Sequence, residues 1–131
     1  MTPAPILRAA SLAGGIFGLV AVGLGAAADH VLRPVVPAGD FANLQIAVRY
    51  ALIHAGLLCA LGLTRFVTIP PQTTRLLALA AGCFGVGVAL FSGGIYAGIA
   101  LQAPFLLHLA PIGGISLMLG WLVLAASAVF A

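Results

Sequence analysis

Four long apolar stretches take up almost the whole 131-residue chain, and only short breaks separate them. A helix that crosses the hydrocarbon core of a bilayer needs roughly 20 consecutive apolar residues, and each stretch is about that long or longer. Charged residues make up 5% of the chain, against roughly 25% in soluble proteins, so they cannot form a water-facing surface. We therefore expect four transmembrane helices, at about 9–29, 41–64, 74–100 and 104–130.

The pattern within the stretches indicates helices and not a barrel. A membrane-spanning β-barrel alternates apolar and polar residues, and this sequence has no such alternation. In lipid every backbone amide needs an internal partner, which a bundle of helices provides. The first stretch, at 9–28, is longer than the apolar core of a signal peptide, so we count it as a span. The sequence predicts one all-α domain over 1–131, an integral four-helix transmembrane bundle.

Proline and glycine mark the connections between the spans. Two prolines and a glycine within 33–39 end the first helix, because proline lacks the amide hydrogen that a helix interior needs. Asp40 is the expected N-cap of the second helix. Pro70 and Pro71 mark the next turn, and 102–104 forms the last. Because this last connection is short, the third and fourth helices should be antiparallel neighbours.

The arginines predict how the bundle is oriented. Cytoplasmic loops of membrane proteins carry an excess of arginine and lysine. Three arginines fall on one side of the predicted bundle, and one arginine falls on the other side with both aspartates. This bias places both termini in the cytoplasm. The residues of the cytoplasmic side are Arg8, Arg65 and Arg75, and those of the outer side are Arg33, Asp29 and Asp40.

Several functional classes lack support in the sequence. The arginines are scattered, whereas nucleic-acid binding needs a basic cluster on an exposed face, so we expect no nucleic-acid partner. No grouping of a nucleophile, a base and an acid is visible, so we expect no enzymatic activity. Cys59 and Cys83 lie in apolar stretches without a C-x-x-C pattern. They are typical of small buried residues, with a disulfide between two helices as the alternative.

Arg49 and His54 stand out because charged and titratable side chains are costly within a span. For a helix that begins at 41, Arg49 lies roughly 12 Å and His54 roughly 20 Å from the helix start. Arg49 either extends its stem to the outer interface or forms an ion pair with Asp29 at the outer end of the first span. The third alternative is that Arg49 binds an anion or a lipid headgroup.

His54 shares a helix face with Tyr50, four residues earlier. A histidine in mid-membrane hydrogen-bonds to a neighbour, relays protons, or binds a metal or haem. His30 and His108 are expected nearer the outer side, and no two of the three histidines have the i, i+3 or i, i+4 spacing of a metal site. We therefore expect no metal and no other cofactor, and a histidine hydrogen-bonded inside the bundle, with haem ligation as the alternative.

Ser92 and Tyr96 also lie four residues apart and share one face of the third span. Hydroxyl groups within a span hydrogen-bond to neighbouring helices. If this face meets Tyr50 and His54, the four side chains form a polar network near mid-membrane.

Small residues predict where helix backbones approach closely. G-x-x-x-G pairs occur in the first and third spans, and two adjacent glycines follow Pro111 in the fourth. Pro111 is expected to remove one backbone bond and to kink the entry to the fourth helix. Trp121 lies deeper than a tryptophan of the membrane interface. The expected packing glycines are Gly14, Gly18, Gly94, Gly98, Gly113 and Gly114.

Four separated blocks of the sequence resemble the motifs of one family, catalogued as domain of unknown function 423. The blocks read Gly-Ala-Ala-Ala-Asp-His-Val-Leu at 25–32, Ala-Val-Arg-Tyr-Ala-Leu-Ile-His-Ala at 47–55, Leu-Phe-Ser-Gly-Gly-Ile-Tyr at 90–96, and Ala-Pro-Ile-Gly-Gly at 110–114 followed by Gly-Trp at 120–121. Asp29 departs from the family motif, which has alanine there. The resemblance implies four transmembrane helices in a bacterial inner membrane, and it implies no reaction, cofactor or substrate.

Two kinds of function fit these features. The first is a non-enzymatic protein that binds membrane lipids, a membrane-protein partner or a second copy of itself through its glycine-rich faces. The alternative is transport of a small molecule or of protons by an oligomer. The candidate ligand-binding or network residues are Arg49, Tyr50, His54, Ser92, Tyr96, Asp29 and His30.

Overall fold

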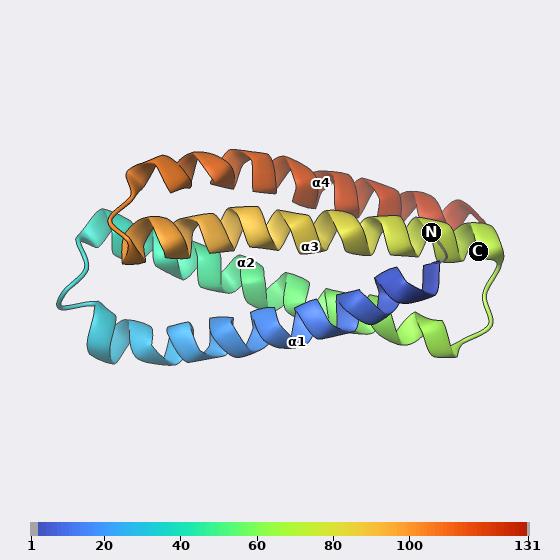
Figure 1. The fold of residues 1–131 in the computed structure, drawn as a ribbon, viewed down its shortest axis with the longest axis horizontal. Helices are drawn as coiled ribbons and strands as arrows, with labels where there is room; N and C mark the ends of the chain where they lie inside the picture. Colours follow the sequence, from blue (N-terminus) through green and yellow to red (C-terminus); the bar gives the residue numbers. More distant parts are fainter. Residues whose placement is uncertain (1–2, 131) are drawn as a thin grey trace.

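Within residues 3–130, which the computed structural model describes, the chain forms four long helices that run alternately up and down (Figure 1). Each helix is long and apolar enough to cross a membrane. The predicted all-helical fold is confirmed. α1 (Pro3–Ala27) continues into a π-helix (Ala28–Leu32), α2 (Ala38–Leu63) into a 3-10 helix (Thr64–Phe66), α3 covers Pro71–Ala100, and α4 (Leu109–Ser127) lies between 3-10 helices at Pro104–His108 and Ala128–Phe130.

α3 is the central helix, because it packs against each of the other three. α1 packs along α2, and α4 packs along α3 on the side away from α1 (Figure 1). α1 begins and α4 ends at the same end of the bundle, where the Thr73 hydroxyl donates to the carbonyl oxygen of Phe130 at 2.6 Å. We call this the terminal end, and the end with the α1–α2 and α3–α4 connections the loop end.

α2 and α3 begin earlier than the sequence predicts, at Ala38 instead of 41 and at Pro71 instead of 74. Pro37 is the N-cap of α2, so the predicted cap is wrong. Asp40 lies within the first turn instead, where the helix dipole favours a carboxylate without a capping bond. The earlier start places Arg49 deeper than expected, roughly 17 Å along α2.

Pro111 lies in the first turn of α4 and not inside the helix. A proline is well tolerated in the first turn of a helix. The chain changes direction before this point. Gln102 adopts a left-handed backbone with a φ of 49° in the short α3–α4 turn, and the 3-10 helix follows.

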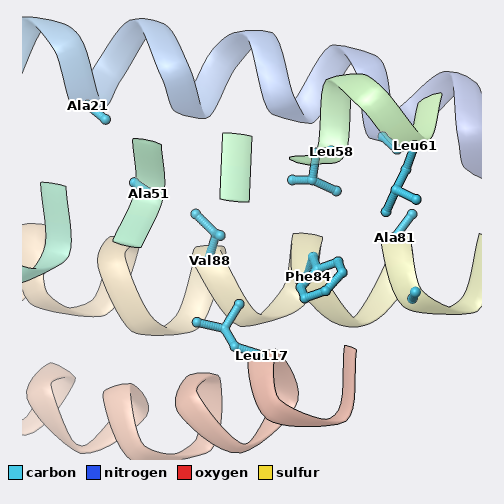
Figure 2. Packing of buried hydrophobic residues seen from close by; sticks show 10 residues of the cluster. Ala21, Ala51, Leu58, Leu61, Ala81, Phe84, Val88 and Leu117 are labelled. Atoms are coloured by element: carbon cyan, nitrogen blue, oxygen red, sulfur yellow. The ribbon is translucent and has the colours of Figure 1, made fainter. Parts of the chain in front are cut away.

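The buried core joins all four helices (Figure 2). At its centre the fully buried ring of Phe84 on α3 packs against His54 of α2 and Trp121 of α4. Alanines fill many of the remaining positions, which lets the helix backbones approach closely in a lipid environment. The members of the core are Ala10, Ala21, Ala51, Leu58, Leu61, Ala80, Ala81, Phe84, Val88 and Leu117.

Glycines set the distance between α1 and α2. A side-chain carbon at Gly14 would lie 2.7 Å from both the carbonyl oxygen of Ala55 and the sulfur of Cys59, closer than a Cβ atom comes to such neighbours in proteins. Gly62, which no sequence motif marks, lies as close to the α1 backbone, because a carbon added there would lie 2.7 Å from a carbonyl oxygen of α1. Gly18 is looser, since its added carbon would touch only the Ala55 side chain at 3.6 Å. The predicted close contact is confirmed at Gly14.

The second G-x-x-x-G pair faces the α3–α4 connection. A carbon at Gly94 would lie 3.0 Å from the carbonyl oxygen of Leu106, and one at Gly98 would lie 3.2 Å from the Leu107 side chain. Both predicted pairs therefore serve contacts within one chain. The chain itself occupies these faces, so the expected self-association of two copies through them is not supported.

Candidate functional site

His54 is buried where α2 meets α4. Its side chain is 4% exposed. Nδ1 lies 2.8 Å from the carbonyl oxygen of Tyr50, and the indole nitrogen of Trp121 donates to Nε2 at 3.2 Å. A carbonyl oxygen only accepts and an indole N–H only donates, so these contacts fit a neutral imidazole with its hydrogen on Nδ1. His54 is thus hydrogen-bonded inside the bundle, as expected from the sequence, and Trp121 is the partner that the sequence did not reveal.

Aromatic rings surround His54. The rings of Phe84 and Trp121 lie 5.4 and 5.9 Å from the imidazole, measured between ring centroids, and 5.3 Å from each other. Tyr50 stacks on His54 and packs against Phe91 of α3 with a centroid distance of 4.8 Å. The rings of Tyr50, His54, Phe91 and Trp121 line a cavity of about 340 Å³ between α2, α3 and α4. The hydrogen bond to His54 explains why Trp121 lies deeper than an interfacial tryptophan.

The three histidines do not converge. His54 uses both ring nitrogens inside the bundle, whereas His30 and His108 are exposed at the loop end. Across the described range 3–130, no group of three or more histidine, cysteine or acidic side chains is placed to hold a metal ion. Cys59 and Cys83 are free thiols, so the alternative of a disulfide between helices is wrong.

Ser92 and Tyr96 lie on the side of α3 that faces α1 and α2. The Ser92 hydroxyl donates to the carbonyl oxygen of Ala47 on α2 at 2.8 Å. The Tyr96 hydroxyl is buried and has no hydrogen-bond partner in the described part of the chain. Both side chains line an apolar cavity of about 200 Å³ between α1, α2 and α3, which Phe17 of α1 also lines.

Replacing Tyr96 by phenylalanine is expected to leave the free energy of unfolding unchanged or to raise it by about 1 kcal/mol, because a buried hydroxyl without a partner is destabilising. The matched control is Ser92→Ala, which removes the bond to Ala47 and should lower stability by about 1 kcal/mol. Reversible unfolding in mixed micelles with increasing dodecyl sulfate measures both variants. An equal loss in the two variants would mean that the Tyr96 hydroxyl is bonded after all.

The predicted four-residue polar network is therefore divided. Ser92 meets the α2 stripe that contains Ala47, whereas Tyr50 and His54 lie on the neighbouring stripe, which faces α4. Successive side chains of a helix point about 100° apart, so neighbouring stripes of α2 face different helices. The rotation of α2 about its own axis therefore separates the two pairs. Ser92 and Tyr96 line one cavity, and Tyr50 and His54 line another.

Arg49 lines a third cavity, of about 320 Å³, on the surface of the bundle where α1 meets α2. We call it the α1–α2 cavity. Arg49 is exposed, and within residues 3–130 it makes no hydrogen bond or ion pair. Gln45, one turn earlier on α2, adds a second polar group to the same wall. The cavity extends from the loop end of α1 to the middle of α2. Its lining residues are Gly25, Ala28, Asp29, Gln45, Val48, Arg49 and Leu52.

Asp29 lines the same cavity, but its partner is Arg33 and not Arg49. Its Oδ1 accepts a hydrogen bond from Nη2 of Arg33 at 2.8 Å. The ion pair between Asp29 and Arg49, one of the three alternatives for Arg49, is therefore not formed. Arg33 lies four residues further along the same turn, so a local pair forms without any helix packing. Arg33 engages one oxygen of Asp29, and Arg49 has no acidic partner within residues 3–130.

The family model described as Protein of unknown function (DUF423) matches residues 24–114 of the chain, which is more than half of its length. This chain belongs to the DUF423 family. The predicted resemblance is confirmed, and the matched residues include the 25–32, 47–55, 90–96 and 110–114 blocks, although 120–121 lies beyond them.

Relatives of this DUF423 protein are membrane proteins. It is 28% identical to the UPF0382 membrane protein YwdK of Bacillus subtilis over 88% of its own length and 92% of that protein. It is 28% identical to the UPF0382 inner membrane protein YgdD of Escherichia coli K12, over 87% of its length and 84% of that protein. A UPF0382 membrane protein of Staphylococcus epidermidis is 30% identical over 85% and 87%. No solved structure matches significantly. The DUF423 protein is accordingly a multi-pass membrane protein.

Direct contacts join the motif blocks of this DUF423 protein. The second block meets the third through the bond from Ser92 to Ala47, and it meets the Gly-Trp pair at 120–121 through the bond from Trp121 to His54. Asp29, by contrast, departs from the family motif and lies in the cavity of Arg49. Residues of the motif blocks thus form contacts between helices, while Asp29 and Arg49, at positions where the motif does not specify these residues, line the α1–α2 cavity.

Proposed function

We propose that this DUF423 protein is a non-enzymatic membrane protein that binds the phosphate of a phospholipid in the α1–α2 cavity. The observation that carries the proposal is Arg49, an arginine within a span that has no acidic partner among residues 3–130. Arginine binds phosphate well, because its planar guanidinium can donate two parallel hydrogen bonds. A phospholipid phosphate is the anion that the surroundings of the cavity always offer.

The depth of Arg49 supports this role. It lies roughly 17 Å along α2, closer to the middle of the helix than to its start. Placing an unpaired arginine at such a depth costs up to about 3 kcal/mol, which an anionic partner, a local thinning of the bilayer or water reduces. The cavity provides a route for a headgroup, since its lining extends from Asp29 at the loop end to Leu52 in the middle of α2. A phosphate that enters this route neutralises Arg49.

The arginines support an orientation as well. Arg8 lies in the first turns of α1, Arg65 in the 3-10 helix after α2, and Arg75 in the first turns of α3. These segments share the terminal end of the bundle. The positive-inside rule places this end in the cytoplasm, with both termini. The cavity of Arg49 then opens toward the outer leaflet, and the proposed ligand is an outer-leaflet lipid.

The structure gives less support to transport of protons or small molecules. Arg49, His54 and Tyr96 line three different cavities and do not form a common pathway. His54 donates through Nδ1 and accepts through Nε2, so a protonated imidazole would leave the Trp121 N–H without its acceptor. For these reasons we favour lipid binding over transport.

Replacing Arg49 by glutamine is expected to weaken phospholipid binding about tenfold, the size of a charge-assisted hydrogen bond between partly exposed groups. The probe is dioleoylphosphatidylcholine added to delipidated protein in a maltoside detergent, and native mass spectrometry counts the bound lipid. Dioleoylglycerol, which has the same acyl chains and no phosphate, should bind both proteins weakly and equally.

The control variant is Arg75→Gln, which removes another exposed arginine from the opposite end of the bundle. It should bind the phospholipid as the wild type does. The proposal fails if Arg49→Gln retains wild-type binding, or if the wild type does not distinguish the phospholipid from dioleoylglycerol.

A further inference from the structure

We propose that the α1–α2 cavity selects a phospholipid whose headgroup carries a primary ammonium group, the phosphoethanolamine class. This selectivity rests on the proposed phosphate site at Arg49. The observation behind it is that one cavity holds both signs of charge, Arg49 on the α2 wall and Asp29 on the α1 wall.

The carboxylate of Asp29 is only partly used by the protein. Its Oδ1 accepts from Arg33, while Oδ2 has no partner in the described part of the chain. The Asp29 side chain is 59% exposed, and Arg33 is not part of the cavity lining. A carboxylate oxygen that lines a cavity and lacks a donor is a site for an N–H group of a ligand.

Asp29 and Arg49 do not form an ion pair across the cavity, so the two charged groups remain separate. A ligand that bridges them must present an anion to α2 and a cation to α1. Phosphoethanolamine does so within one headgroup, with a phosphate for Arg49 and an ammonium for Asp29.

Other common headgroups satisfy only part of this arrangement. The quaternary ammonium of phosphocholine has a charge but no N–H to donate, and phosphoglycerol has no cation and would bring its negative charge close to Asp29. The local π-helix at Ala28–Leu32 contains Asp29, and this irregular turn sets its position relative to α2.

The test compares dioleoyl lipids with ethanolamine, choline and glycerol headgroups on delipidated protein, with bound lipid counted by native mass spectrometry. The wild type should prefer the ethanolamine lipid about fivefold, the upper range for an exposed ion pair. In Asp29→Asn this preference should disappear, while the choline lipid should bind as before. Asp29 is exposed, so this nearly isosteric variant is expected to keep the fold.

The control is Asp40→Asn, which removes the other aspartate of the loop end, whose side chain lines a different cavity. It should keep the ethanolamine preference. Equal binding of the three lipids by the wild type, a preference for the glycerol lipid, or an unchanged preference in Asp29→Asn would overturn the selectivity. These outcomes are distinct from failure of the phosphate site, which is signalled by unchanged binding of the choline lipid in Arg49→Gln.

Discussion

Replacing Gly113 by alanine is expected to lower the free energy of unfolding by about 3 kcal/mol, because the added methyl group forces α3 and α4 apart. A carbon at this position would lie 2.8 Å from both the carbonyl oxygen of Gly87 and the Cα of Phe91, and it would be closer still to the Phe91 amide nitrogen. These are backbone atoms, which cannot rotate away as a side chain can. Unfolding in mixed micelles with increasing dodecyl sulfate measures the loss.

The adjacent glycine provides the matched control. A carbon at Gly114 would meet only the Phe91 ring, at 3.9 Å, which is ordinary contact. Gly114→Ala should therefore leave stability unchanged or raise it by up to about 1 kcal/mol, since alanine favours the helix. A similar loss in both variants would show that the α3–α4 contact is not limited by the backbone at Gly113.

The spans were predictable because they depend on the composition of long segments. A stretch such as 74–100 is predominantly apolar, and in lipid its backbone amides need partners within the segment, which a helix provides. The exact starts depend on single residues. Asp40 has the chemistry of an N-cap, but the helix starts at Ala38, directly after Pro37, and the sequence does not distinguish these options.

The contacts between helices could be predicted only in part. Spacing within one helix showed that Tyr50 and His54 share a face, and that Gly14 lies on a close-packing face. It could not show which helix each face meets, because this depends on how the helices rotate against one another. Hence Trp121 was recognised as unusually deep but not as the partner of His54.

The candidate site shows the same limit. Arg49 and Asp29 were identified from their type and depth, and the structure places both in one cavity. The alternative of a direct ion pair between them is wrong, although the competing partner is visible in the sequence. Arg33 lies four residues after Asp29, and such local pairs need no tertiary contact. A local ion pair should therefore be considered before a long-range one.

Replacing His54 by alanine is expected to lower the free energy of unfolding by about 3 kcal/mol, because it leaves a cavity among aromatic rings and removes the acceptor of the Trp121 N–H. The imidazole packs against Phe84 and Tyr50, and its Nε2 accepts the Trp121 N–H at 3.2 Å. The same dodecyl sulfate titration measures the loss. His108→Ala is the control, because this histidine is exposed at the loop end, and its removal should change stability by less than about 0.5 kcal/mol.

A double-mutant cycle separates the hydrogen bond from the packing. Trp121→Phe keeps an aromatic ring between α2 and α4 but removes the indole donor. If the bond from Trp121 to His54 stabilises the bundle, the double variant should be more stable than the sum of the single losses predicts, by about 1 kcal/mol. Strict additivity would mean that the bond from Trp121 adds nothing to stability, and that Nε2 of His54 is free for another partner.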